Sequence, residues 1–541
     1  MSETSSATLP LLIAGGGPTG LSLAITCGRF GVPVRIIDRA EQPSAVSKAL
    51  AVWSGSLEAF DGMGVMPQFL AAGVRLHGLS AGTRGRELVS LKVGPGIDSP
   101  YPFPLLLPQS RTEQILGGRL AELGTTVERG VELADFTQDA DGVTATLRHM
   151  DGREERVRTQ YLVGCDGARS TVRQKLGVEF QGFTEKQICL LVDARIEGRA
   201  LDPASIYLWW QNGGTIALFP VESGVWRVFA ARDGQGDHPA TLEELQAAMD
   251  RHGPGGMRLA DPSWLSIFRT NERLAARYRV GRCFLAGDAA HIHSPAGGQG
   301  MNTGIQDAVN LGWKLGQVLN GVGQTELLLD SYEAERRPIA REVVKGAAQK
   351  FHMAYGAGLG PKLLKNMVVP LVMRFPAAQR RLQIELSETE IVYREGALIG
   401  LGAPPAKPRR TEVGARARDA LIRDPGRASP RQLWPVLGEP RHTLLLFGTH
   451  TLPVQVAAAE GKWLRIEHLE VTDRGQENAA ARYGMSRPGW VMVRPDQVVA
   501  ARGDSASLDR VAAYVGQVIS PALQRTGSGP ASKVHDRQHA A

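Results

Sequence analysis

Hydrophobic and polar positions over the first 40 residues predict a strand, a helix and a second strand in succession. Residues 11–14 form a continuous apolar run, which is typical of a strand buried on both faces. A glycine-rich segment at residues 15–20 follows, and apolar residues then recur with helical spacing as far as Cys27. A second apolar run at residues 32–37 ends at Asp38. This order predicts a β-α-β unit at the start of a parallel sheet.

Two later stretches repeat the change from strand to helix. Residues 283–286 are a short apolar run that stops at Gly287 and Asp288, and a turn rich in Pro and Gly then leads into a helical pattern. Residues 105–116 also turn from strand to helix and place Arg111 within the first helical turns. Because the positive end of the helix dipole disfavours a cation there, Arg111 indicates a specific anionic partner.

Residues 129–280 are patterned mainly as antiparallel strands joined by turns. Three β-rich runs between residues 206 and 231 are separated by glycine-containing segments that favour hairpins. Tyr207, Trp209 and Trp210 lie on the first of these runs and project from both faces of the predicted sheet. Each aromatic side chain either lines an apolar pocket or packs in the ordinary core, and the pattern leaves both open.

The C-terminal half is patterned as helices and then as a small α/β unit. Spacing predicts helices over residues 325–352 and 362–395, and we expect the apolar run 367–373 to pack against other helices. A segment rich in Pro and Gly at residues 400–410 is typical of a linker. Four apolar runs and a helical pattern beyond it predict a small separate domain, and we expect the polar tail from Arg525 to be disordered.

Composition and charge exclude several classes of protein. The net charge is +7, but the basic residues are scattered among acidic ones without a cluster that alternates with aromatic residues, which argues against nucleic-acid binding. The four cysteines lie far apart and form no CxxC pair, so the sequence predicts neither a disulfide framework nor a metal site. No run of 18 apolar residues occurs, so we expect no membrane span and a cytoplasmic location.

Two of the strand-to-helix transitions carry residues suited to binding a dinucleotide. Residues 15–20 form a GxGxxG, whose glycines permit a tight turn and the close approach of a pyrophosphate, while Asp38 at the end of the next strand can bind a ribose hydroxyl. Asp288 at a strand end can accept hydrogen bonds from a sugar or ribityl hydroxyl. The glycines that follow leave backbone N–H groups uncovered at a helix start, which favours an anionic ring or a phosphate.

Taken together, these residues resemble the FAD-dependent aromatic hydroxylase family, the single-component flavoprotein monooxygenases with the para-hydroxybenzoate hydroxylase fold. The resemblance is closest to polyketide and phenol hydroxylases with a C-terminal thioredoxin-like domain. It rests on three motifs in order: the GxGxxG with Asp38 and Arg39, Cys-Asp-Gly-Ala-Arg-Ser-Thr-Val-Arg at residues 165–173, and Gly287-Asp288. It covers residues 11–342 strongly and residues 414–502 more weakly.

The resemblance implies an α/β fold class with a discontinuous domain organisation. A Rossmann-like FAD-binding domain would comprise residues 1–179 and 270–350, and an inserted, mainly antiparallel substrate-binding domain residues 180–269 and 351–399. A linker at residues 400–412 would join a thioredoxin-like domain at 413–524, followed by the tail at 525–541. Because the C-terminal domain has no CxxC pair, we expect it to be structural rather than redox active.

The resemblance also implies which residues bind the cofactor. The first motif would hold the ADP part of FAD, the second would contribute to FAD and nicotinamide binding, Asp288 would bind the ribityl chain, and residues 295–302 would lie beside the isoalloxazine ring. The implied set is Gly15, Gly17, Pro18, Thr19, Gly20, Asp38, Arg39, Lys48, Arg111, Gln114, Asp166, Asp288, Pro295, Gly298, Gln299, Gly300, Met301 and Asn302. The candidate substrate contacts are Tyr207, Trp209, Trp210 and Pro295. Asp38 replaces the family's usual Glu, and Lys48 replaces an Arg and loses its planar fork.

The implied reaction is an aromatic hydroxylation. NADH or NADPH would reduce FAD, O₂ would add to give a flavin hydroperoxide, and the distal oxygen of the hydroperoxide would attack a small, electron-rich aromatic substrate. The protein itself would be a monomer or a homodimer. Two alternatives stay open: Baeyer-Villiger oxidation or epoxidation on the same scaffold, and a non-catalytic FAD-binding interaction protein. No catalytic base is assigned, because His291 and His293 are more typical of structural residues in such a loop. Neither the substrate nor the choice between NADH and NADPH follows from the sequence.

Overall fold

The computed structural model describes most of the chain. The described residues are 8–43, 49–211, 214–222, 224–232, 236, 238–295, 297–355, 364–399, 412–423, 429–471 and 478–521. Lys48, nearly all of the predicted linker and the whole of the predicted disordered tail lie outside the described residues.

The first large sheet has a parallel centre, as the β-α-β pattern predicts. Its order is β17-β18-β11-β1-β2-β8, in which β1, β2, β8, β11 and β18 are parallel, and a hairpin of β9 and β10 continues from β11. Its strands are β1 (Leu9–Ala14), β2 (Val34–Asp38), β8 (Val127–Arg129), β9 (Val131–Gln138), β10 (Val143–His149), β11 (Glu154–Gly164), β17 (Arg279–Val280) and β18 (Cys283–Leu285). Residues 11–14 are buried because helices and strands cover both faces of this sheet, which explains their continuous apolar run.

Two helices that are far apart in the sequence pack closely against each other over this sheet. These are α1 (Pro18–Arg29) and α7 (Gly300–Leu319), and the glycines of α7 make the close approach possible. A Cβ atom added at Gly312 would lie 2.7 Å from Thr26 Cγ2, and one added at Gly316 would lie 2.6 Å from Phe30 Cγ. Helix α7 is therefore held against α1 at a distance that any larger side chain would increase.

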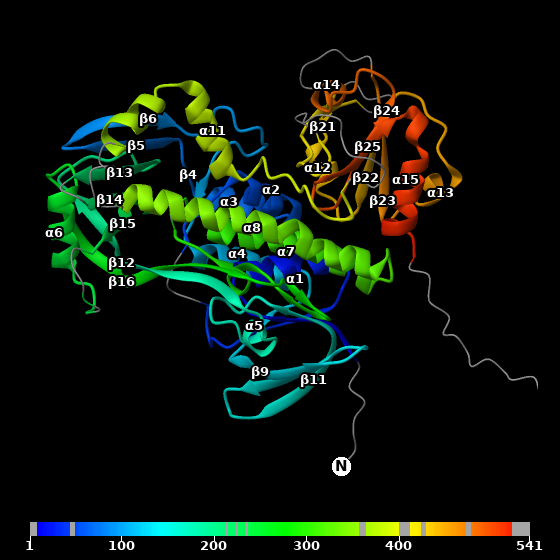
Figure 1. The fold of residues 1–541 in the computed structure, drawn as a ribbon, viewed down its shortest axis with the longest axis horizontal. Helices are drawn as coiled ribbons and strands as arrows, with labels where there is room; N and C mark the ends of the chain where they lie inside the picture. The colour runs from blue at the N-terminus through cyan, green and yellow to red at the C-terminus, as the bar shows by residue number, and fades with distance from the viewer. Residues whose placement is uncertain are drawn as a thin grey trace, which may run out of the picture.

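The second large sheet is mainly antiparallel and lies beside the first (Figure 1). Its order is β19-β16-β12-β15-β14-β13-β5-β6, and the pairing of β13 with β14 and of β14 with β15 confirms the predicted hairpins. Its strands are β5 (Gly78–Thr83), β6 (Arg86–Lys92), β12 (Phe180–Glu197), β13 (Ser205–Gln211), β14 (Gly214–Glu222), β15 (Val225–Ala231), β16 (Arg258–Ala275) and β19 (His291–Ile292). Helix α6 (Leu242–His252) packs on one face of the sheet, and Phe351 of α8 (Thr325–Tyr355) packs on the other.

Smaller elements fill the space between the two sheets and cover their edges. They are the three-stranded sheet of β3 (Ala51–Val52), β4 (Val74–Arg75) and β7 (Leu105–Leu106), and the helices α2 (Ser54–Met63), α3 (Met66–Ala72), α4 (Gln109–Glu122), α5 (Thr171–Lys175), α10 (Val369–Val372) and α11 (Pro376–Ser387). The sequence predicts one helix at residues 362–395, but the structure has three successive elements there: a π-helical turn at Leu364–Val368, then α10, then α11. The expectation that residues 367–373 pack against other helices holds only in part: Met373 packs against the same cluster as Leu382 of α11, whereas Met367 is 64% exposed and Leu371 is 57% exposed.

The C-terminal residues form a four-stranded sheet of order β23-β22-β24-β25. Strands β22 and β23 are parallel, whereas β24 is antiparallel to both β22 and β25. The main elements are β22 (His442–Phe447), α13 (Val454–Ala458), β23 (Leu464–Leu469), β24 (Gly489–Val493), β25 (Val499–Asp504) and α15 (Asp509–Tyr514). The predicted alternation of strands with a terminal helix is thus confirmed.

This C-terminal unit has a core cluster of its own and also packs closely against the rest of the chain. Leu444, Leu446 and Trp490 belong to the same hydrophobic core as α1 and α7. At the same interface, the Glu335 carboxylate accepts hydrogen bonds from Arg494 at 2.7 and 2.9 Å and from Lys314 at 2.8 Å. Hydrophobic contact and a fully buried ion cluster therefore bind the C-terminal unit to α7 and α8.

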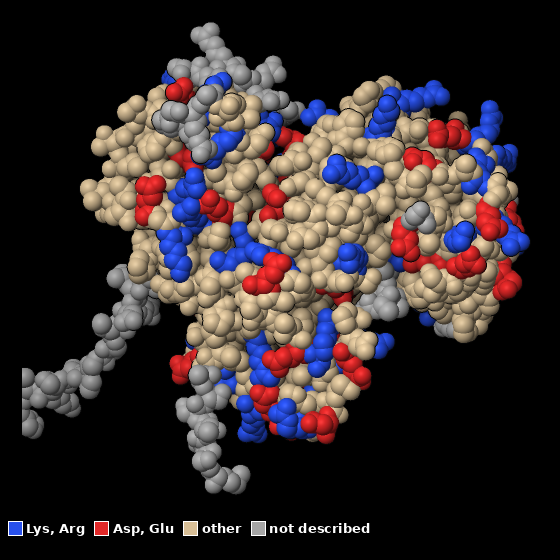
Figure 2. All heavy atoms as spheres, turned by 180° about the vertical axis from the view of Figure 1, so that it is seen from behind, with Lys and Arg blue, Asp and Glu red and all other residues tan. Residues whose placement is uncertain are grey.

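Two further observations concern the surface. Figure 2 shows Lys and Arg side chains interspersed with Asp and Glu on one face of the molecule, without a large area of a single sign. In the described part of the chain, no helix is long and apolar enough to cross a membrane.

The crossing of α1 and α7 predicts opposite effects for two helical glycines. We expect Gly312→Ala to lower the free energy of unfolding by about 1–3 kcal/mol, because its methyl group would overlap Thr26. Gly346→Ala in α8 is the matched control, since nothing lies within 4 Å of the added Cβ and alanine favours a helix by about 1 kcal/mol. Thermal unfolding of the two variants checks this, and equal midpoints would contradict the proposed close packing.

The buried ion cluster predicts a large cost for removing one cation. We expect Arg494→Met to destabilise the protein by about 3–5 kcal/mol, because Glu335 would keep its buried charge with only one of its two cations. Arg258→Met is the control, because Arg258 and Glu197 form an exposed pair at 3.5 Å and such pairs contribute about 0–1 kcal/mol. Chemical unfolding measures both variants, and a small effect of Arg494→Met would show that the cluster is dispensable.

Candidate functional site

The GxGxxG segment forms a tight turn between β1 and α1. Gly15 has φ of +109°, and a Cβ there would lie 2.2 Å from the Cys165 carbonyl oxygen. A Cβ at Gly20 would lie 1.9 Å from the Gly15 carbonyl oxygen. By contrast, nothing lies within 4 Å of a Cβ placed on Gly17, and no side chain caps α1. The turn therefore offers uncovered N–H groups and free space at the positive end of a helix, which suits a phosphate.

Asp38 lies at the end of β2, beside this turn. Its Oδ2 accepts a hydrogen bond from the Gly16 N–H at 2.7 Å, and its Oδ1 accepts one from the Ala40 N–H at 2.8 Å. Arg129 of β8 approaches Asp38 Oδ2 at 3.6 Å, a neighbour that sequence reasoning missed because it comes from a different strand. Arg39 is exposed at the same strand end. Asp38 thus fixes the glycine turn against β2, in addition to any role toward a ligand.

The second motif connects the glycine turn with the Asp288 turn. Asp166 Oδ2 accepts hydrogen bonds from the N–H groups of Thr171 and Val172 at the start of α5, whereas its buried Oδ1 makes no hydrogen bond within the part of the chain that the structure describes. Burial raises the pKa of Asp166. Arg173 donates to the Ala289 carbonyl oxygen at 3.0 Å, so the segment 165–173 also positions the turn that contains Asp288.

Asp288 lies in a single 3-10 turn, Gly287–Ala289, directly after β18. Its side chain is exposed, whereas Gly287 and Ala289 are buried on either side. A Cβ on Gly287 would lie 2.5 Å from Thr19 Oγ1, so Asp288 directly adjoins the start of α1. The carboxyl ends of parallel strands therefore bring the first and third motifs to one edge of the sheet, as the resemblance implies.

Residues 295–302 form a glycine loop that leads into α7. Gly297 and Gly298 have φ of +105° and +63°, and no side chain caps the start of the helix. Asn302 is fully buried and binds backbone: it donates to the Ala51 and Gly298 carbonyl oxygens and accepts from the Trp53 N–H. This hydrogen bonding argues against a direct side-chain contact between Asn302 and a ligand.

The remaining predicted cofactor residues fall into two groups. Arg111 and Gln114 are exposed in the first turns of α4, where the Arg111 guanidinium donates to the Gln114 amide oxygen. Pro295, Gly300 and Met301 are exposed or half-buried, whereas Gln299 is buried and donates to the Glu385 carbonyl oxygen at 3.3 Å. The structure thus leaves Arg111 and Gln114 accessible to a ligand, whereas the Gln299 side chain points into the protein.

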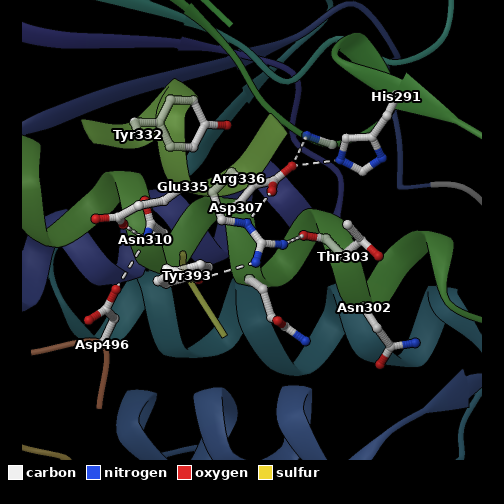
Figure 3. Close-up of polar contacts among 12 residues, drawn as sticks. His291, Asn302, Thr303, Asp307, Asn310, Tyr332, Glu335, Arg336, Tyr393 and Asp496 are labelled. Carbon is white, nitrogen blue, oxygen red and sulfur yellow. Dashed lines mark hydrogen bonds and ion pairs between the residues drawn. The ribbon is translucent and has the colours of Figure 1, made fainter. Parts of the chain in front are cut away.

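A buried carboxylate that the sequence did not reveal holds the Asp288 turn and α7 together. Asp307 accepts from Arg336 Nε at 2.7 Å, contacts His291 Nε2 at 2.7 Å and accepts from the Gly287 N–H at 3.2 Å (Figure 3). Burial alone would raise the pKa of Asp307, but His291 and Arg336 hold it below its ordinary value. His291 is thus placed in a structural pair. Only the spacing of Asp307 along the buried face of α7 could have suggested this residue.

The aromatic residues of β13 lie on opposite faces of the second sheet. Tyr207 and Trp209 stack with ring centroids 5.1 Å apart on the face that α6 covers. Trp210 faces the other way, and its Nε1 donates to the Asn366 side chain at 2.7 Å. This packing argues against the predicted substrate contacts of Tyr207 and Trp209, because α6 covers their face of the sheet.

The opposite face of the second sheet, which we call the inner face, carries an apolar cluster that sequence reasoning missed. It lies beside Phe351 of α8 and consists of Cys189, Leu191, Leu208, Ala217, Phe219, Phe229, Trp264 and Phe268. Several of these side chains, among them Phe219, Trp264 and Phe268, are only partly buried. The described residues contain no cluster of His, Cys, Asp or Glu that could hold a metal ion.

Comparison with known proteins gives a consistent result. A family model described as FAD binding domain matches residues 8–347. The 6-methylpretetramide 4-monooxygenase of Streptomyces rimosus is 37% identical, over 91% of this chain and 90% of its own length.

Solved structures extend the similarity to nearly the whole chain. An anhydrotetracycline hydroxylase from Streptomyces rimosus matches with a TM-score of 0.77 and 32% identity, over 95% of this chain and 99% of that chain. An aklavinone-11 hydroxylase in a ternary complex with FAD and aklavinone matches with a TM-score of 0.77 and 25% identity, over 96% of this chain and 100% of that chain. These matches confirm the resemblance predicted from the motifs. The chain belongs to the FAD binding domain family and is an FAD-dependent monooxygenase related to aromatic and polyketide hydroxylases.

Proposed function

We propose that the protein uses NADH or NADPH and O₂ to insert one oxygen atom into a phenolic or polyketide-like aromatic molecule. The observation that carries this proposal is the meeting of the glycine turn, the exposed Asp288 and the uncapped start of α7 at one edge of the parallel sheet. Two of the relatives named above support the substrate class, since their names give 6-methylpretetramide and anhydrotetracycline as the compounds on which they act.

Features of this chain fit FAD. The empty space beside Gly17 and the uncapped start of α1 suit a pyrophosphate, and the unpartnered, buried Asp166 Oδ1 leaves an acceptor free beside the turn. We propose that FAD is held by Gly15, Gly17, Pro18, Thr19, Gly20, Asp38, Arg39, Arg111, Gln114, Asp166, Asp288, Pro295, Gly298, Gly300 and Met301. FAD, when bound and reduced by the nicotinamide, supplies the activation of O₂.

The protein's own contribution is positioning and exclusion of water. Asp307 and Arg336 fix the Asp288 turn relative to the start of α7. The glycines of the loop that precedes α7 leave N–H groups at the positive helix end, where they would stabilise negative charge. We propose that the substrate lies against the inner face of the second sheet, where Leu191, Phe229 and Phe268 provide an apolar wall. This position differs from the contacts predicted for Tyr207 and Trp209.

We also propose the domain organisation that the motifs imply. The FAD-binding part would comprise residues 1–179 and 270–350, and the substrate-binding part residues 180–269 and 351–399. The β23-β22-β24-β25 order, with α13 joining the parallel β22 and β23, supports a thioredoxin-like unit at residues 413–524. All four cysteines precede residue 284, so this unit would act structurally through its buried interface.

The direct test is oxygen incorporation. Purified protein should show flavin absorption, and its oxidation of NADH or NADPH should rise when polycyclic phenols are added. Mass spectrometry should detect one ¹⁸O atom from ¹⁸O₂ in the aromatic product. An ester or epoxide product would instead indicate Baeyer-Villiger oxidation or epoxidation, and protein that cannot take up FAD would contradict the proposal.

Gly17 provides a sharp test of the cofactor site. We expect Gly17→Val to fold normally, because its φ of −80° suits any residue and no heavy atom lies within 4 Å of an added Cβ. It should weaken FAD binding at least about 10-fold, since loss of even one charge-assisted hydrogen bond to phosphate costs about 1.5–3 kcal/mol. Fluorescence titration with FAD measures this, and Gly117→Ala in α4, whose Cβ also meets nothing, should bind FAD like the unchanged protein.

The two faces of the second sheet should respond differently to substitution. We expect Phe268→Ala to weaken binding of an aromatic substrate about 10- to 100-fold, because a large apolar contact of about 1.5–3 kcal/mol is lost. Trp209→Phe, on the face that α6 covers, should leave substrate affinity within about 2-fold, because the ring does not adjoin the proposed wall. The dissociation constants of one phenolic substrate for the two variants test this expectation. A larger effect of Trp209→Phe than of Phe268→Ala would place the substrate on the face that α6 covers.

A further inference from the structure

A buried carboxylate on β16 adjoins the loop that precedes α7 and has an oxygen without a partner. Glu272 is 2% exposed, and its Oε1 accepts a hydrogen bond from the Ser294 N–H at 3.0 Å. Its Oε2 is buried and makes no hydrogen bond among the described residues. Because a buried polar atom without a partner costs about 1–3 kcal/mol, this oxygen is expected to have a role.

Glu272 lies on the inner face of the second sheet, the face proposed to hold the substrate. Side chains two residues apart on a strand share a face, so Glu272 and Thr270 lie on the same side of β16 as Phe268. Phe268 packs in the apolar cluster of that face. The hydroxyl of Ser294, whose N–H binds Glu272, donates to the Ala347 carbonyl oxygen of α8, and α8 also lies on this side.

Thr270 provides a second unpartnered polar group beside Glu272. It is 3% exposed, and its Oγ1 is buried without a hydrogen bond among the described residues. Opposite it, the register of β12 shifts between Thr184 and Ile188, and such bulges often occur beside active sites. Same-face residues follow one another about 7 Å apart along a strand, so a ring against Phe268 would have its hydroxyl within reach of these two groups.

Among the described residues, no cation is found paired with Glu272. Glu185 of β12 is a like charge and lies 3.2 Å from His352 of α8. Lys350 of α8 pairs with Glu385 at 2.7 Å, and burial lowers the pKa of His293 in the adjacent loop to about 4, so that it is neutral near pH 7. Burial, with a smaller contribution from Glu185, raises the pKa of Glu272 to about 7 despite the Ser294 hydrogen bond.

We propose that Glu272 Oε2, assisted by Thr270, accepts the hydrogen bond of a phenolic hydroxyl on the substrate and acts as its general base. This assignment rests on the proposed function. In the step, the substrate O–H bond breaks, the proton moves to Glu272, and the electron pair stays on the phenolic oxygen. The resulting phenolate is more electron-rich, which favours transfer of oxygen to its ring.

The binding test compares 2-naphthol with its methyl ether, 2-methoxynaphthalene, on the full-length protein loaded with FAD. The ether cannot donate a hydrogen bond. We expect the ratio of the two dissociation constants to exceed about 10 at pH 8, as for a hydrogen bond to a charged group. The ratio should fall as the pH drops below about 7, because protonated Glu272 no longer accepts the hydrogen bond.

Glu272→Gln separates this role from a purely structural one. Its amide oxygen can still accept from the Ser294 N–H, so the loop and the FAD content should be retained, whereas the ratio should fall to near 1 at every pH. Hydroxylation of a phenol should slow about 10²- to 10⁴-fold. Thr270→Val, a second variant that leaves the carboxylate intact, should lower the ratio about 2- to 10-fold, as for a neutral hydrogen bond.

The outcomes distinguish this proposal from the proposed function. A Glu272→Gln variant that keeps the ratio and its pH dependence would overturn the role of Glu272. FAD-loaded protein that binds neither naphthalene compound would overturn the placement of phenols on this face. Failure of the unchanged protein to bind FAD would instead contradict the proposed function.

Discussion

The arrangement of the site depends on one buried carboxylate, that of Asp307. It lies on α7, binds the Gly287 N–H and His291 on the β18 side, and binds Arg336 from α8. A carboxylate taken out of water needs such partners, because an unpaired buried charge is strongly destabilising. Since these partners come from separate elements, the same interaction that neutralises Asp307 also fixes the Asp288 turn relative to the start of α7.

The ion cluster around Glu335 extends this framework to the C-terminal unit. Glu335 and Arg336 are neighbours on α8, but their side chains bind different partners. Arg336 binds Asp307 (Figure 3). Glu335 binds Lys314 of α7 and Arg494 of the C-terminal unit. Burial alone would raise the pKa of Glu335, but the two cations hold it at about 2. The C-terminal unit is therefore bound to α7 and α8, the same two helices that hold the Asp288 turn at the carboxyl edge of the first sheet. This contact gives a structural role to a unit that contains no cysteine.

We propose that the two faces of the second sheet have different roles, packing on one face and substrate binding on the other. Helix α6 covers the side of Tyr207 and Trp209, and this side is a conventional core. The inner face combines partly buried apolar side chains with two buried polar groups that lack partners, Thr270 and Glu272. An apolar surface with a few polar groups at one end suits a phenolic ring better than either a saturated or a strongly charged molecule.

The sequence by itself determined the β-α-β unit with its glycine turn, the strand that ends at Asp288 and the glycine-led helix after it. These features follow from local pattern, since the GxGxxG, the apolar runs and the helical spacing each involve residues close together in the sequence. Only the tertiary structure decided which face Trp209 occupies, that Asn302 binds backbone, that Asp307 meets Arg336, and that the C-terminal unit shares the main core. The partners joined by these hydrogen bonds lie 29 to 251 residues apart, and no local periodicity specifies which distant surface will cover a given side chain.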